Sequence, residues 1–329
     1  MKFLFLHKFN SYWDKKLNEL KLDYPDIEII FPEKEKLSKE ELLKDVDAII
    51  GGFITKKELE FAKKLKIIFV PFAGVEQLPL DDLKERNIII SNAHGNGKYV
   101  AERAVALALA LLGKIIYFHN DLKKGIWHGF TVGESIFESW NSIQGKKIGI
   151  LGFGAIGQNI AEFLKPFNTK IYILKNHKIN KLPKNVDEIY YNVDKIIEDS
   201  EILFLTLPLT EKTYEIINEE RLMKMKDKFL INVGRGKLIH EEGLYNALKN
   251  RILKGVALDV WFNYPTSKSK NVMPSNYPIW EFDNVILSPH VGGYSYHATT
   301  AGINYTIDSI KKYLKEGMPL SIVDYNKKY

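Results

Sequence analysis

Hydrophobic and polar positions along the first ninety or so residues follow two periods in alternation. Short apolar runs typical of buried strands occur at residues 3–6, 27–31, 48–52, 67–71 and 88–91. Between these runs, polar segments with apolar residues at helical spacing predict helices at residues 13–22, 39–44, 56–64 and 81–85. Alternating strands and helices indicate βαβ units, so this region is expected to form a small parallel sheet flanked by helices.

A long helix is predicted next, at residues 99–120, where apolar residues recur every three or four positions and after which Gly125 and Gly129 end the region. Six further apolar runs predict the parallel strands of a doubly wound domain, at residues 148–151, 171–174, 202–205, 229–233, 255–260 and 285–288. The loop at 264–279, rich in Ser, Asn and Pro, is expected to be exposed and mobile. A helix at 298–313 and a strand at 320–323 end the chain and could return to the first domain.

The first strand of the second series runs into a glycine-rich turn with the spacing G-x-G-x-x-G. Its first glycine permits a tight turn, the second lets a pyrophosphate approach the backbone, and the third lets the following helix pack closely on the strand. The helix N-terminus adds free N–H groups that bind phosphates. Because a strand precedes the turn and a helix and a second strand follow, we interpret it as a dinucleotide site. The residues expected to line it are Gly152, Phe153, Gly154, Ala155, Ile156 and Gly157.

Composition narrows the class of protein. A chain of 329 residues with 45% hydrophobic and 27% charged residues is typical of a globular protein of two domains. It has no cysteine, which excludes disulfides, thiol nucleophiles and zinc–thiolate sites and fits a cytoplasmic protein, and no metal is expected. The net charge of +6 is spread over the chain among 41 acidic residues, so it suits anionic substrates and predicts no nucleic-acid partner. The most apolar run, 104–112, is too short to span a membrane.

Several separated motifs, taken together and in order, resemble those of the D-isomer-specific 2-hydroxyacid dehydrogenases over nearly the whole chain. Besides the glycine turn they are Val100-Ala101-Glu102, Gly125-Ile126-Trp127, Leu207-Pro208-Leu209-Thr210, Ile231-Asn232-Val233-Gly234-Arg235-Gly236, Leu258-Asp259-Val260 and Ser288-Pro289-His290. The resemblance implies an α/β protein of two Rossmann-like doubly wound domains. A flavodoxin-like substrate domain, residues 1–95 plus 294–329, would be split around a dinucleotide-binding domain at 96–293. The resemblance also implies a homodimer, to which the 99–120 helix and an arm at 125–140 contribute.

The resemblance also implies roles for individual residues. Reduction of a 2-oxo acid needs a cation for the substrate carboxylate and carbonyl, and a proton donor for the carbonyl oxygen. Arg235 matches the substrate-binding arginine and His290 the acid/base histidine. In isolation, a surface ion pair and a structural histidine would be the more common explanations, and the family position reverses that order. Ala73, Gly74, Val75 and Asn96 match positions that contact the substrate in the family, and Asp259 matches the aspartate that bonds the nicotinamide amide. The remaining cofactor-side positions are Leu207, Pro208, Val233, Gly234 and Gly292.

One departure from the family pattern is Tyr264, which stands where a glutamate normally pairs with the histidine. Tyrosine is neutral at pH 7, so it can orient the imidazole without holding it charged. We hypothesise that the pKa of His290 is lower than in glutamate-bearing relatives, which weakens reduction above neutral pH. Formate dehydrogenases of the same superfamily have glutamine here, so formate oxidation is one alternative activity. A cofactor-sensing binding protein, similar to the C-terminal-binding corepressors, is another, although Arg235 and His290 argue against it.

The second departure lies at the end of the second strand of the nucleotide domain. Relatives that prefer NAD usually have an aspartate there for the ribose hydroxyls, whereas this chain has Lys175, Asn176, His177 and Lys178. A ribose 2′-phosphate would find cationic partners in this segment, so NADP is predicted as the preferred cofactor, with NAD and an ordinary basic loop as the alternative. The leading hypothesis is an NAD(P)-dependent enzyme that reduces a small 2-oxo acid, of the glyoxylate or hydroxypyruvate type, to the D-2-hydroxy acid.

Overall fold

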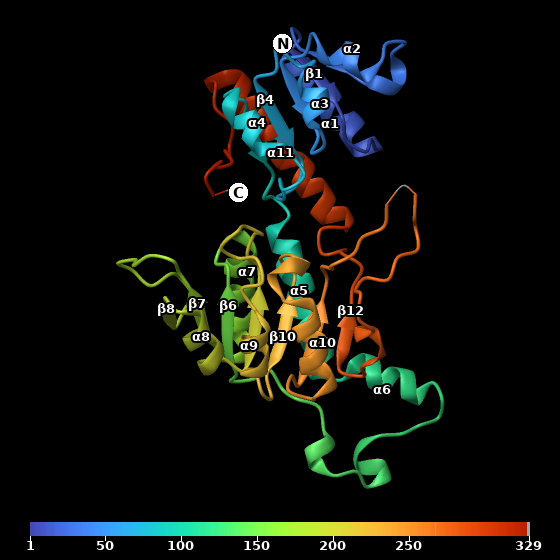
Figure 1. Cartoon of the computed structure of the whole chain (residues 1–329), viewed down its shortest axis with the longest axis vertical. Helices are drawn as coiled ribbons and strands as arrows, with labels where there is room; N and C mark the ends of the chain where they lie inside the picture. The colour runs from blue at the N-terminus through green and yellow to red at the C-terminus, as the bar shows by residue number, and fades with distance from the viewer. Residues whose placement is uncertain (267, 328–329) are drawn as a thin grey trace. The chain divides into compact units, whose positions relative to one another are not determined.

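The computed structural model describes residues 1–266 and 268–327, which form two compact units (Figure 1). The first unit combines Met1–Asn96 with Ser295–Tyr329, and the second is Gly97–Tyr294. Residue 267 of the predicted loop and residues 328 and 329 of the predicted substrate domain lie outside the described residues. Each unit is an α/β layer structure around a parallel sheet, which confirms the predicted fold class.

The sheet of the first unit has the order β2-β1-β3-β4-β5, the flavodoxin-like order. Its strands are β1 (Lys2–Phe5), β2 (Glu28–Ile30), β3 (Ala48–Ile50), β4 (Ile67–Val70) and β5 (Ile89–Asn92). The connecting helices are α1 (Ser11–Asp23), η1 (Pro32–Lys34), α2 (Lys39–Leu43), α3 (Lys56–Leu59) and α4 (Leu80–Glu85). All five strands and the four α-helices were predicted from the hydrophobic pattern, although α3 is shorter than the predicted 56–64.

The C-terminal helix α11 (Tyr296–Glu316) returns to the first unit, where Ile303, Ile307 and Ile310 are buried in the same cluster as residues of β1 and β4. It ends at Gly317, whose φ of 76° is in the left-handed region. The predicted strand at 320–323 is wrong. The segment runs beside β5 with a bond from Val323 N–H to the Ile90 carbonyl, but the Leu320 N–H is donated to the Ser309 hydroxyl and no ladder forms.

The second unit contains a parallel sheet with the order β12-β11-β10-β9-β6-β7-β8. The chain adds β7 and β8 on one side of β6 and then adds β9 to β12 on the other side, as in doubly wound dinucleotide domains. Its strands are β6 (Lys147–Leu151), β7 (Lys170–Leu174), β8 (Glu188–Tyr190), β9 (Ile202–Leu205), β10 (Phe229–Asn232), β11 (Gly255–Leu258) and β12 (Val285–Leu287). Six of these strands were predicted. The edge strand β8 was missed because it has three residues, none of them fully buried, and therefore gives no apolar run.

The helices of the second unit lie on both faces of its sheet (Figure 1). They are α5 (Gly97–Leu112), α6 (Ile115–Leu122), α7 (Ala155–Leu164), α8 (Val193–Asp199), α9 (Glu219–Met223) and α10 (Glu241–Lys249), with short 3₁₀ turns η2 (Gly129–Val132), η3 (Ile136–Glu138), η4 (Lys165–Phe167), η5 (Gly236–Leu238) and η6 (Ile279–Glu281). The single helix predicted at 99–120 is wrong, because Lys114 adopts a φ of 50° after Gly113 and separates α5 from α6. None of the α-helices in the described part of the chain has the length and apolarity needed to cross a bilayer.

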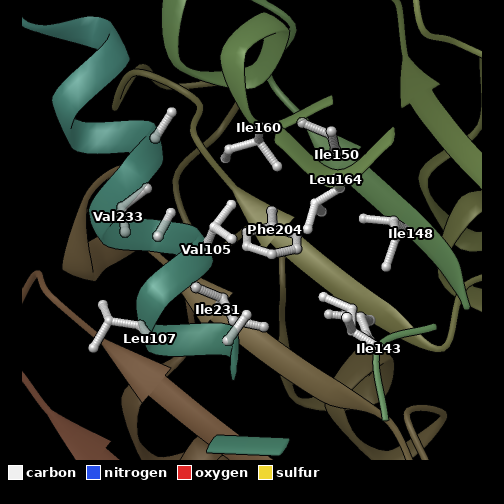
Figure 2. Packing of buried hydrophobic residues seen from close by; sticks show 14 of the residues in the cluster. Val105, Leu107, Ile143, Ile148, Ile150, Ile160, Leu164, Phe204, Ile231 and Val233 are labelled. Carbon is white, nitrogen blue, oxygen red and sulfur yellow. The ribbon is translucent and has the colours of Figure 1, made fainter. Parts of the chain in front are cut away.

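Figure 2 shows the core on one face of this sheet. Val105 of α5 and Ile160 of α7 converge on Phe204 of β9, with Ile150 and Ile231 beside them, and all are buried. Burial of each such side chain contributes roughly 1.5–3 kcal/mol. The close packing of α5 and α7 on the sheet fixes the position of the glycine turn that joins β6 to α7.

Candidate active site

The glycine turn forms a cradle at the N-terminus of α7. Gly152 directly follows β6 with a φ of 102°, a conformation that side chains strongly disfavour. A Cβ atom at Gly157 would lie 2.2 Å from the Gly152 carbonyl oxygen, so this position requires glycine for close packing. A Cβ atom at Gly154 would meet nothing within 4 Å, which leaves open space at the helix N-terminus. These residues fit a dinucleotide whose pyrophosphate approaches the backbone there.

The loop after β7 adjoins the same cradle. The Lys175 ammonium lies 5.6 Å from the centroid of the Phe153 ring, which belongs to the glycine turn. Asn176, His177 and Lys178 are exposed. On the other side of the turn, Leu207 follows β9, and its backbone nitrogen would lie 2.8 Å from a Cβ atom at Gly152. The structure thus brings these predicted cofactor-side segments together around the turn.

Arg235 is held by the loop that follows β10. The side chain of Asn232, the fully buried last residue of β10, donates to the Arg235 carbonyl at 2.8 Å and accepts from the Gly234 N–H at 3.0 Å. The guanidinium donates to the Gly234 carbonyl at 2.8 Å. Asn232 had no predicted role, although a polar residue at the end of an otherwise apolar strand, directly before Val-Gly-Arg-Gly, is a signal that could have found it.

His290 follows β12, the strand that pairs with β11, and its side chain is exposed. Its φ of 55° lies in the left-handed region, which costs a non-glycine residue roughly 1–2 kcal/mol. The buried carboxylate of Asp259 holds the residues on either side: one oxygen accepts from the Ser288 hydroxyl and the Val291 N–H, and the other from the Gly292 N–H at 2.8 Å. Asp259 therefore fixes the backbone that presents the imidazole, and its contact with a nicotinamide amide stays a prediction.

Tyr264 contacts His290 through its ring, with the two ring centroids 5.4 Å apart and the planes inclined by 56°. Its hydroxyl oxygen accepts from the Trp261 N–H at 3.0 Å. Burial raises the pKa of Tyr264, while the Trp261 N–H and the nearby Arg235 charge act in the opposite direction. The phenol is neutral at pH 7. The three residues with predicted catalytic roles, Arg235, Tyr264 and His290, follow the carboxyl ends of the adjacent strands β10, β11 and β12.

The predicted substrate-side residues belong to the other unit. Ala73, Gly74 and Val75 follow β4, and the side-chain amide of the buried Asn92 donates to the Ala73 carbonyl at 2.7 Å. Asn96 is the last residue of the first segment of this unit. Their contact with a substrate that Arg235 and His290 also bind stays a prediction. Within residues 1–266 and 268–327, no group of three or more His, Asp or Glu side chains is placed to hold a metal ion.

Comparisons with known proteins give similarities over most of the chain. The family model described as D-isomer specific 2-hydroxyacid dehydrogenase, NAD binding domain, matches residues 105–292. The chain is 31% identical to the glyoxylate reductase of Thermofilum pendens over 87% of its own length and 85% of that protein. It is also 31% identical to the hydroxypyruvate reductase of Thermotoga maritima, over 93% and 96% of the two chains. The crystal structure of an NADPH-dependent glyoxylate/hydroxypyruvate reductase from Sinorhizobium meliloti with NADP and malonate superposes with a TM-score of 0.80 at 25% identity, covering 99% and 97% of the two chains.

Proposed function

Because the chain belongs to the D-isomer specific 2-hydroxyacid dehydrogenases, a family of NAD(P)-dependent oxidoreductases, we propose that it reduces a small 2-oxo acid of the glyoxylate or hydroxypyruvate type to the D-2-hydroxy acid. The observation that carries this proposal is the Asp259-held loop, which presents His290 at the carboxyl end of β12, in the unit that also contains the dinucleotide cradle and the Arg235 loop. Relatives named glyoxylate reductase and hydroxypyruvate reductase support the substrate class.

Each side chain has a defined task in this reaction. The dinucleotide, when bound in the glycine cradle, supplies the hydride that reduces the carbonyl carbon. The Arg235 guanidinium binds the anionic substrate and polarises its carbonyl. As hydride adds to the carbonyl carbon and negative charge develops on the carbonyl oxygen, the His290 imidazolium donates a proton to that oxygen. In the reverse direction, the neutral imidazole accepts the proton from the hydroxyl group. Tyr264 packs on the imidazole and supports its orientation, without adding a charge.

The cofactor is proposed to be NADP in preference to NAD. The support is the segment Lys175, Asn176, His177 and Lys178, in which no carboxylate is available for ribose hydroxyls and cations are available for a 2′-phosphate. The contact between Lys175 and Phe153 puts this basic segment beside the glycine cradle. The solved relative from Sinorhizobium meliloti, described as NADPH-dependent, is in keeping with this assignment.

We further propose that the enzyme is a cytoplasmic homodimer that uses the arm between α6 and β6. This arm exposes many large apolar side chains, more than an isolated surface normally carries: Ile126, Trp127, Phe130, Val132, Ile136, Phe137 and Trp140, of which Phe137 is 96% exposed. A hollow of about 360 Å³ that can accept side chains of a second copy is lined by five of them, Ile126, Trp127, Phe130, Ile136 and Trp140. Light scattering should give the mass of a dimer for the wild type and of a monomer for Phe137→Asp.

The folded shape of the arm depends on His128. Its Nε2 lies 3.0 Å from a carboxylate oxygen of Asp121, and its Nδ1 lies 2.8 Å from Glu134. The ring also packs on Tyr117 and Phe118 of α6. The hydrogen bond to Asp121, followed by the contact with Glu134, raises the pKa of His128 although partial burial acts against it. A protonated His128 thus ties the arm to α6.

The experiment that tests the proposed function is a turnover assay with purified protein, NADPH or NADH, and a series of 2-oxo acids. Oxidation of NADPH by glyoxylate or hydroxypyruvate, with a D-2-hydroxy acid as product, is the expected result. Reduction of NAD or NADP by formate instead would favour the formate dehydrogenase alternative. Tight dinucleotide binding with no turnover on any of these substrates would favour a cofactor-sensing protein.

A further inference from the structure

Three loops of the second unit end neighbouring strands. They follow β10, β11 and β12, which pair in that order, and they carry Arg235, Tyr264 and His290. Trp261 lies in the middle loop and is only 6% exposed. Its backbone and its indole contact all three loops, and the mechanism derived above gives it no role.

The indole N–H of Trp261 donates to the Ser288 carbonyl at 2.8 Å. The same carbonyl oxygen accepts the backbone N–H of His290 at 2.9 Å. The Trp261 indole therefore binds the atom to which the His290 amide is itself tied. Because His290 is in a left-handed conformation that the surrounding contacts have to maintain, this bond acts together with the Asp259 carboxylate to fix the loop.

The backbone of Trp261 contacts the other two loops. Its N–H donates to the Tyr264 hydroxyl oxygen, which sets the direction of the ring that packs on His290. Its carbonyl oxygen would lie 2.1 Å from a Cβ atom at Gly236, so the Arg235 loop packs directly on the Trp261 backbone. The buried Trp261 thus contacts the loops that carry Arg235, Tyr264 and His290 and sets the distances between them.

We propose that Trp261 is a positioning residue, whose indole N–H holds the His290 loop in its reactive geometry. This inference rests on the proposed function only for its effect on turnover, since the effect on the loop can be measured in the protein alone. Misplacement of a catalytic group by about 1 Å can cost up to about a hundredfold in rate. Loss of a single hydrogen bond, with the ring still present, should cost about tenfold.

The experiment replaces Trp261 by Phe, which keeps an aromatic ring and removes the donor. Trp280→Phe is the matched control, because Trp280 of η6 is partly buried against a core cluster of the same unit and, within residues 1–266 and 268–327, makes no hydrogen bond to any of the three loops. Hydrogen exchange of residues 285–292, dinucleotide affinity, and the kcat and KM for the best 2-oxo acid are measured for both. A second Trp261 replacement, by the tryptophan analogue that has sulfur in place of the indole N–H, keeps the shape of the side chain should Trp261→Phe fold poorly.

We expect faster exchange at residues 288–292 and a kcat about tenfold lower in Trp261→Phe, with dinucleotide affinity within about twofold of the wild type and Trp280→Phe unchanged. Unchanged exchange and kcat in a folded Trp261 variant would overturn the inference. Equal losses in both variants would show a general effect on the core and would also overturn it. If the wild type reduces no 2-oxo acid, the proposed function fails, while the exchange comparison still decides whether Trp261 holds the His290 loop.

Discussion

Replacing Tyr264 by glutamate places a carboxylate beside His290 and tests how the neutral partner sets the pH range of the reaction. A glutamate carboxylate reaches about as far from the backbone as the centre of a tyrosine ring. The distance between the Tyr264 and His290 rings, 5.4 Å, is therefore a fair measure of the new charge separation. The replacement also removes the phenol that accepts the Trp261 N–H, so an uncharged variant of the same length is needed as a control.

The magnitude follows from Coulomb's law. At 5.4 Å, two opposite unit charges attract by roughly 3 kcal/mol at an effective dielectric constant of about 20 and by roughly 0.8 kcal/mol in water. Because the His290 side chain is exposed and Tyr264 is 42% exposed, a value between these limits applies, and about 1.4 kcal/mol corresponds to about one pKa unit. The carboxylate favours the imidazolium, so the pKa of His290 should rise by about that amount in Tyr264→Glu.

The assay is the pH dependence of kcat/KM for 2-oxo acid reduction. Reduction needs protonated His290, so the alkaline decline of the profile should move upward by about one pH unit in Tyr264→Glu. Tyr264→Gln, which has the same reach without the charge, should leave the decline where it is in the wild type. If the profiles of Tyr264→Glu and wild type coincide, or if Gln and Glu shift them equally, the reasoning about the neutral partner is refuted.

Three further predictions concern the cofactor site and the arm. Lys175→Asp should move the ratio of kcat/KM for NADPH and NADH toward NADH by at least tenfold, and an unchanged ratio would count against the basic segment as the 2′-phosphate site. Gly157→Ala should lower the free energy of unfolding by about 1–3 kcal/mol, because its Cβ meets the Gly152 carbonyl, whereas Gly154→Ala should leave stability nearly unchanged and weaken dinucleotide binding; urea unfolding and a binding titration separate the two. The raised pKa of His128 means that its bonds stabilise the arm fully below the ordinary histidine value of 6.5 and are lost as the pH rises through the higher folded-state pKa, so proteolysis of residues 126–140 in the wild type should accelerate as the pH rises through that pKa. The same proteolysis should be fast and independent of that titration in His128→Gln.

The hydrophobic pattern was sufficient for every strand of the two sheets except β8, because most of these strands are buried on both faces and give continuous apolar runs, whereas β8 has no fully buried residue. It failed where local contacts decided the outcome. The left-handed Lys114 divides a helix whose apolar spacing continues through the break, and the Ser309 hydroxyl takes the N–H that would have begun a strand at 320–323.

Some residues of the candidate site could be predicted from the sequence and others could not. Arg235, His290 and the glycine turn are recognisable from motifs, because each lies next to residues with a characteristic spacing. The bonds that hold them are harder to recognise. Asp259 matched a motif only for a nicotinamide contact, and its bonds to the His290 loop, like that of the Trp261 indole, depend on the pairing of β11 and β12. Asn232 acts through local bonds within the loop after β10. No local spacing shows that the indole of Trp261 reaches the carbonyl of Ser288, which is distant in sequence.

The central claim is that His290, held by Asp259 and its neighbours, delivers the proton in the reduction of a 2-oxo acid. The most direct measurement is the consumption of NADPH by wild type and His290→Gln with saturating hydroxypyruvate or glyoxylate, with dinucleotide binding measured for both. We predict that the wild type turns over and that kcat in His290→Gln falls by about 10²–10⁴-fold with dinucleotide affinity preserved. Turnover by His290→Gln within a few fold of the wild type would contradict the account.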